Sequence, residues 1–404
     1  MTILILVIGV LLFIGLIISH EFGHFIMARR NGVEVEEFGI FFPPAIYKRK
    51  TKDGWVFSIN ALPLGGFVKL KGEHDSDKQK GSYGAASLWV KTKIMLAGVT
   101  MNLITALVLL TIISLIGMPE VLANQFKVAS NTKTNVSKVL VGYVEPGSPA
   151  YKIGLKSDDQ LISIGKVGSK QLKITSASTL PSLTKSLASQ KVNIYFLNNH
   201  KLIKKTTTLL SLSVVGASQS AYLKKIKSTK LDCLNVTSPK GYLGITANQY
   251  MLERSTWAAP INAVGFSIQA TVVTFAGLGH ALGGLGSAIA GIVSGNSVVR
   301  ANGVCRATSE VTGPVGIAII LKDSASLGFT FMLFVIAIIS LTLAIMNLLP
   351  VPALDGGRLW MTLFTHAIKK PLSPKREEAI VAGSMIILIC LFILITISDV
   401  HRFL

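Results

Sequence analysis

The sequence predicts a multi-pass α-helical membrane protein with one inserted β-rich domain. Half of the 404 residues are hydrophobic and only 15% are charged, which is well below the roughly 25% usual in soluble domains. The apolar residues are concentrated in long uncharged runs, each close to the ~20 residues that a helix needs to cross a bilayer. One stretch between these runs instead alternates like β-strands and contains turn residues.

Four runs predict transmembrane helices because they contain no Asp, Glu, Lys or Arg. These runs are Ile3–Ser19 (continuing to about Met27), Ile94–Met118, Leu327–Leu349 and Ala379–Ile397. The first run has no basic segment before it and no small-residue cleavage site after it, so we expect a retained span rather than a signal peptide. The segment between Arg254 and Arg300 also lacks charged side chains. A fifth span is one interpretation, but helices that lie on the membrane or pack against the bundle are more economical.

Basic residues predict the orientation of the chain. Arg29 and Arg30 follow the first span, and five more basic residues separate the last two spans: Arg358, Lys369, Lys370, Lys375 and Arg376. By the positive-inside rule both connections are cytoplasmic, so both termini are expected outside. The region between the second and third spans has 22 Lys or Arg against 8 Asp or Glu, which is most of the net charge of +20. This surface either favours anionic lipid head groups or wall polymers, or only keeps the domain soluble.

The β-rich domain is expected outside the membrane, at residues 130–235. Val139–Glu145 and Gln160–Ile164 alternate like strands, with the turn and short helix of Gly147–Leu155 between them. Val192–Leu197 and Leu202–Leu209 predict a hairpin. This order resembles a PDZ domain of the bacterial protease type, which implies binding of peptide chain ends by strand addition. A generic small β-rich domain stays the alternative.

The three cysteines, Cys233, Cys305 and Cys390, form neither a disulfide scaffold nor a zinc-ribbon pattern. Cys233 and Cys305 can pair if both face an oxidising space. Two unpaired thiols are an equally good interpretation, so both stay open.

A metal-binding motif ends the first predicted span. His20-Glu21-Phe22-Gly23-His24 fits the pattern H-E-x-x-H. Residues four apart share one face of a helix, so two imidazoles can bind one zinc ion while Glu21 acts as the general base. Ionisable side chains are costly inside a membrane and are by default functional. The motif therefore indicates a zinc metalloprotease.

Asp355 is the predicted third protein ligand, since zinc bound by two His needs a further ligand and an open position. It follows Pro350 and Pro352, which interrupt a helix, and precedes Gly356 and Gly357. His20 comes 17 residues after Ile3, or about 26 Å along a helix, toward the cytoplasmic side. Asp355 follows the third span at the same side. A single additional crossing between Arg254 and Arg300 would place it on the opposite face.

These motifs together resemble the site-2 protease family, and within it the bacterial RseP-type regulator-of-sigma proteases. The resemblance rests on H-E-x-x-H, on the Asn347–Gly356 motif (N-x-x-P-x-P-x-L-D-G) and on Pro63–Val68 (PLGGFV). It implies that His20, His24 and Asp355 bind Zn²⁺ and that Glu21 is the catalytic base. It also implies substrate-binding roles for four residues: Asn347, Gly65, Gly66 and Phe67. Residues 34–70 would form a re-entrant β-hairpin that presents the substrate.

The resemblance divides the chain into an N-terminal catalytic part (1–118), the PDZ-like domain (130–235), a Gly-rich membrane-surface segment (236–326) and a C-terminal catalytic part (327–404). It implies an intramembrane zinc endopeptidase of the bacterial inner membrane. Expected substrates are single-span proteins, such as anti-sigma factors and signal-peptide remnants. The expected partners are therefore these substrates and the lipid bilayer, and no nucleic acid. A non-catalytic PDZ adaptor or inactive homologue is the alternative, while a transporter is disfavoured because no inverted repeat of interrupted spans is present.

Overall fold

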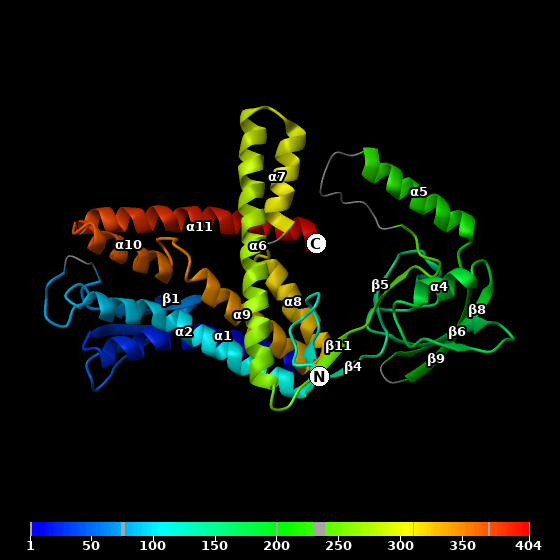
Figure 1. Cartoon of the computed structure of the whole chain (residues 1–404), viewed down its shortest axis with the longest axis horizontal. Helices are drawn as coiled ribbons and strands as arrows, with labels where there is room; N and C mark the ends of the chain where they lie inside the picture. Colours follow the sequence, from blue (N-terminus) through cyan, green and yellow to red (C-terminus); the bar gives the residue numbers. More distant parts are fainter. Residues whose placement is uncertain are drawn as a thin grey trace.

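Four long apolar helices run roughly along the longest axis of the molecule (Figure 1). They are α1 (Thr2–Arg30), α2 (Leu88–Ile116), α9 (Phe329–Met346) and α11 (Pro374–Phe403). The computed structural model describes residues 2–73, 77–198, 201–228, 239–309, 311–370 and 372–403. All four predicted spans are confirmed as helices. Helix α2 begins six residues earlier than its uncharged run because Ser87 caps it, the Ser87 side chain accepting a hydrogen bond from the Val90 N–H.

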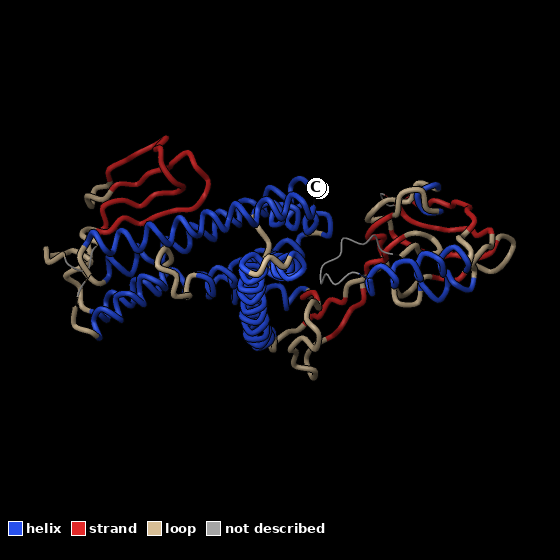
Figure 2. The backbone as a smooth tube through the Cα atoms, turned by 90° about the horizontal axis from the view of Figure 1, so that it is seen from above, coloured by secondary structure: helices blue, strands red, loops and turns tan. Residues whose placement is uncertain are grey.

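Helix α6 (Ala259–Val293) is a fifth helix that is long and apolar enough to cross a membrane. It does not run with the other four but lies across them, as the two perpendicular views show (Figures 1 and 2). Helix α7 (Ser297–Ser309) folds back along it. The two backbones approach closely at glycines, since a Cβ added to Gly303 would lie 2.2 Å from the backbone nitrogen of Ala288. Helix α8 (Pro314–Leu327) then leads directly into α9.

The predicted hairpin is formed by β1 (Val35–Lys50) and β2 (Val56–Leu70), which pair antiparallel. The two strands bend back on themselves, so that the segment of β1 around Ile40 pairs on one side with Ile59 and on the other side with Gly66 of β2. The last part of β2 therefore forms one edge of the sheet, and no other described strand pairs with that edge. Phe25 of α1 anchors the hairpin through ring contacts with Phe38 and Trp55, at centroid distances of 5.6 and 4.9 Å.

A β-rich domain, here called the sheet domain, lies at the other end of the molecule from the hairpin (Figure 2). Its sheet has the strand order β10-β5-β6-β8-β9, with β7 paired to β6. The strands are β5 (Leu140–Val144), β6 (Gln160–Lys166), β7 (Leu172–Lys173), β8 (Lys191–Asn198), β9 (Lys201–Thr208) and β10 (Ile245–Asn248). Its helices are α3 (Pro149–Lys152), α4 (Leu180–Ser186) and α5 (Leu212–Ser228).

The strands and short helix predicted for this domain are confirmed, although residues 199–200, between the two strands of the predicted hairpin, lie outside the described residues. The sheet reaches past the expected boundary at residue 235, since β10 pairs with β5. A small separate sheet of β3 (Met118–Pro119), β11 (Met251–Arg254) and β4 (Lys133–Val136) connects the domain to the helices.

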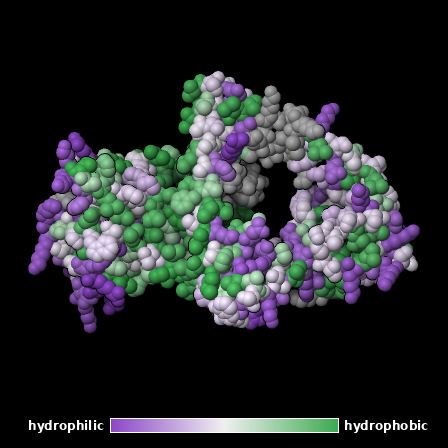
Figure 3. Space-filling model, viewed as in Figure 1, coloured by the Kyte–Doolittle hydropathy of each residue, from purple (hydrophilic) through white to green (hydrophobic). Residues whose placement is uncertain are grey.

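Apolar side chains cover the helical part of the surface, while polar side chains gather at its far end and over the sheet domain (Figure 3). Ile3, Leu11 and Leu394 are each more than 60% exposed. An apolar outer surface of this kind fits contact with lipid rather than water. Among the cysteines, Cys305 is disulfide-bonded and Cys390 is an exposed free thiol, whereas Cys233 lies outside the described residues.

Candidate metal centre

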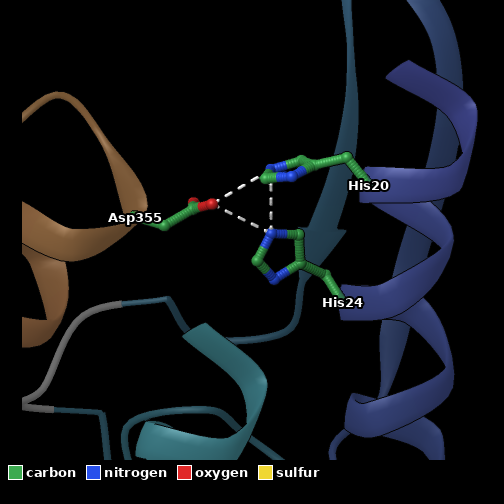
Figure 4. Close-up of side chains that lie close together, drawn as sticks. All are labelled: His20, His24 and Asp355. Carbon is green, nitrogen blue, oxygen red and sulfur yellow. Dashed lines mark hydrogen bonds and ion pairs between the residues drawn. The ribbon is translucent and has the colours of Figure 1, made fainter. Parts of the chain in front are cut away.

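His20 and His24 lie one turn apart near the end of α1 and project from the same face of the helix (Figure 4). Their Nε2 atoms are 3.3 Å apart. His24 is buried with 7% of its surface exposed, and the side chain of His20 is 12% exposed. The helical spacing of the motif therefore brings two potential ligand atoms to one point, as the sequence predicted.

Asp355 reaches the same point from the opposite end of the chain. Helix α9 ends at Met346 with Asn347 as its C-cap, and Asp355 opens α10 (Asp355–Ala367). The connecting loop is closed by a hydrogen bond of 2.7 Å from the Gly356 N–H to the Asn347 carbonyl. A glycine is required next in the chain, because a Cβ on Gly357 would lie 1.9 Å from the Val351 carbonyl oxygen. The predicted interruption after the third span thus aims the carboxylate at the two imidazoles.

The three side chains form a compact ligand set. Asp355 Oδ2 lies 3.0 Å from His20 Nε2 and 3.1 Å from His24 Nε2. Ligand atoms bound at about 2.1 Å in a tetrahedral zinc site are separated by roughly 3.3–3.5 Å. The two spacings to Asp355 are slightly shorter, so a small outward shift of the carboxylate would let the three atoms share one zinc ion. Two imidazoles and one carboxylate are a typical set for catalytic zinc, which leaves the fourth position for water or substrate. Among the described residues, His20, His24 and Asp355 are the group of His, Cys, Asp or Glu side chains that lie close enough together to hold one metal ion.

Gly98 of α2 makes room for the ligand atoms. A Cβ at this position would lie 2.3 Å from His24 Nε2 and 2.5 Å from His20 Cε1. Side chains of any size would therefore fill the space toward which both imidazoles point. Helix α2 also orients the imidazoles, since His24 Nδ1 lies 2.7 Å from the Ile94 carbonyl oxygen and Asn102 contacts His20. A carbonyl only accepts, so Nδ1 of His24 carries the proton and its Nε2 lone pair is free for a metal.

Comparison with known proteins agrees with this geometry. The sequence profile of peptidase family M50 matches residues 8–391. The chain belongs to peptidase family M50, the site-2 protease family. It is similar to proteins named as zinc metalloproteases in Clostridium acetobutylicum (29% identity, covering 98% of this chain and 97% of the relative) and Campylobacter jejuni (29%, covering 96% and 90%). The M50 membership and these relatives identify the chain as a zinc metalloprotease of the site-2 type.

Glu21 of this M50 protease lies next to the hairpin. It lines a narrow crevice between α1 and the hairpin, together with Ile17 and Gly66. A Cβ added to Gly66 would lie 2.8 Å from Glu21 Cγ, so the glycine allows the edge of β2 to pass close to the carboxylate. The crevice therefore places the Glu21 carboxylate beside the free edge of β2.

The other predicted site residues lie around the same centre of the M50 protease. Gly65, Gly66 and Phe67 form the edge of β2 beside Glu21. Asn347 holds the Asp355 loop through its backbone carbonyl, and no described contact tests its expected side-chain role. Gly98 and Asn102 were not predicted as site residues. Their spacing of four residues on one apolar helix is the signal that could have found them.

Proposed function

We propose that this M50 protease cleaves single-span membrane proteins within or at the edge of the bilayer. The observation that carries the proposal is the convergence of His20, His24 and Asp355 inside a bundle whose outer surface is apolar. In this proposal the three residues bind zinc and Glu21 is the general base. Zinc supplies Lewis-acid polarisation of a peptide carbonyl and increases the acidity of water.

Glu21 takes the proton of the attacking water in this mechanism. Its place directly after His20 on α1, at the wall of the crevice, supports the role, because a peptide bound along the hairpin would pass close to this carboxylate. Glu21 can later return the proton to the leaving amine.

The substrate must be extended at the cleavage site, because a helix hides its carbonyls in its own hydrogen bonds. The free edge of β2 at Gly65, Gly66 and Phe67 would stabilise the unwound segment by adding it as a strand. Asn347, on the other side of the centre, is proposed to hold the same segment. The hydrogen bonds of strand addition offset the cost of opening the substrate helix.

The sheet domain is proposed to face the outside of a bacterial inner membrane, as a PDZ-like module that binds chain ends. In this topology α1, α2, α9 and α11 cross the bilayer, and the ligand cluster lies toward the cytoplasm. Helix α6 lies across the four helices (Figure 1), which supports a position along the outer face rather than a fifth crossing. A domain at the mouth of the bundle can filter out substrates with bulky outer parts, leaving shortened anti-sigma factors and signal-peptide remnants.

The test compares the wild type with Glu21→Gln in detergent, using tagged single-span substrates with either a short or a bulky outer domain. We expect Glu21→Gln to retain zinc. Its cleavage rate should fall about 10²–10⁴-fold, which is the usual contribution of a positioned base. The wild type should cleave the short substrates faster. Equal cleavage by both proteins would remove the assigned base. Binding of the tagged chain ends without cleavage by wild type would instead favour the adaptor.

A further inference from the structure

The two imidazoles of the metal centre are oriented by different kinds of hydrogen-bond partner. His24 Nδ1 lies 2.7 Å from the backbone carbonyl of Ile94, which no substitution at that position removes. His20 Nδ1 lies 3.2 Å from the side-chain amide of Asn102, which is about two turns farther along α2 than Ile94. The orientation of His20 therefore depends on one replaceable side chain.

Asn102 is almost completely enclosed, with 1% of its surface exposed. The Nδ2 end of its amide faces His20 Nδ1 in the structure, while the other end, Oδ1, has no hydrogen-bond partner among the described residues. The two ends of an amide have the same shape and exchange by a half-turn of the side chain. Because no described group bonds to the amide end that faces away from His20, the protonation of His20 Nδ1 determines whether the oxygen or the NH₂ group of Asn102 faces the imidazole.

A neutral imidazole carries one proton, on either Nδ1 or Nε2. Nε2 of His20 points at Asp355 Oδ2 and His24 Nε2, so it is the atom that would bind zinc and must offer a lone pair. The proton then lies on Nδ1, which becomes a donor. The amide end that faces it must be the oxygen, because the NH₂ group can only donate.

We propose that Asn102 is a positioning residue, whose amide oxygen accepts a hydrogen bond from His20 Nδ1 and so keeps the Nε2 lone pair directed at the metal. This inference rests on the proposed ligand role of His20. Outer partners of this kind typically contribute 10–100-fold to metal affinity. Asn102 also touches α9, since the Ser340 hydroxyl donates to the Asn102 backbone carbonyl at 2.8 Å, so a packing role needs a separate control.

The experiment measures zinc affinity of the full-length chain in detergent, by competition with a chelator. Asn102→Leu removes the acceptor at similar size and should weaken zinc binding about 10–100-fold. Asn102→Asp keeps an acceptor but cannot donate, so its zinc affinity should stay within a few-fold of wild type. Ser340→Ala, which alters only the contact between α2 and α9, should leave the affinity unchanged.

Wild-type affinity in Asn102→Leu would overturn the proposal, and so would an Asn102→Asp variant as weak as Asn102→Leu, since that result would assign a donor role. An equal loss in Ser340→Ala would show a packing effect instead. Asp355→Ala is included because its failure to lose zinc would refute the ligand set rather than the role of Asn102. If the buried carboxylate of Asn102→Asp prevents purification, Asn102→Leu against Ser340→Ala still decides the question.

Discussion

The membrane helices and the sheet domain distribute polar and apolar side chains in opposite ways. In the sheet domain, the hydrophobic core is built from apolar side chains such as Val192, Ile194 and Phe196, and the lysines of β9 are exposed. Among the membrane helices, large apolar side chains cover the outside, while His24 and Asn102 are buried. The comparison teaches that burial of an apolar residue in the sheet domain indicates stability, whereas burial of a polar residue among the helices indicates function.

Asp355→Ala gives the largest expected effect and tests the functional side of this comparison. Two imidazoles alone leave the metal without its third protein ligand, so zinc affinity should fall at least about 100-fold. Loss of a residue that only hydrogen-bonds to a ligand typically lowers metal affinity about 10–100-fold, and loss of the ligand itself should lower it at least as much. Cleavage should fall with it, while the fold persists. Metal analysis of the purified variant and its circular dichroism spectrum check both points. Full zinc occupancy would refute the ligand role.

Gly98→Ala should give the next largest effect, although it removes no polar group. The added Cβ would lie 2.3 Å from His24 Nε2, so an imidazole must move and zinc affinity should drop by on the order of 10-fold or more. Gly15→Ala on α1 is the matched control, since a Cβ there meets nothing within 4 Å. Both changes favour the helix by about 1 kcal/mol. Equal zinc affinity in the two variants would contradict the steric role of Gly98.

Ile194→Ala tests the stability side of the comparison. This fully buried residue of β8 belongs to the core of the sheet domain, so its truncation should lower the free energy of unfolding of that domain by about 2–5 kcal/mol. Zinc affinity should not change, because the domain contributes no ligand. Hydrogen exchange of the sheet domain measures the first effect. Leu202→Ala on β9, which is 59% exposed, is the control and should change the exchange little.

The sequence predicted the cluster of His20, His24 and Asp355 more completely than its surroundings. His20 and His24 could be paired from helical spacing alone, and the break at Pro350 indicated how Asp355 reaches them. Gly98 and Asn102 were not assigned to the site, because their roles depend on how closely α2 approaches α1, which their spacing alone does not specify. That distance is set by tertiary packing, such as the contact of Gly23 with the Ala97 carbonyl, which a Cβ would meet at 2.7 Å.

In the fold, the four apolar runs and the strands of the sheet domain were predicted within a few residues. For α6 the sequence left two interpretations, a fifth span or the more economical helix that lies on the membrane or against the bundle, because an apolar composition is the same in both. The double pairing of β1 was not predicted, since the alternation of Val35–Lys50 and Val56–Leu70 specifies strands but not how the hairpin folds back on itself. Such features depend on contacts between distant segments.

The smallest expected effect concerns the junction between the two regions. Lys127 bonds to Glu253 of β11, a buried carboxylate, and lies 3.9 Å from Glu120. The hydrogen bond to Glu253 raises the pKa of Lys127 above its ordinary value of 10.5. A raised pKa in the folded state stabilises the fold fully below about pH 10.5, and this contribution is lost as the pH rises through the folded value.

The melting temperature of the wild type should therefore exceed that of Glu253→Gln at pH 8, and the difference should shrink above about pH 10.5. The corresponding difference in the free energy of unfolding should be modest, about 1 kcal/mol or less, because the Lys127 side chain is 35% exposed and water screens the pair. Melting curves of both proteins between pH 8 and 11.5 measure it. A difference that stays constant, or grows with pH, would show that Glu253 stabilises the junction through contacts other than Lys127, such as its bond from Gln125.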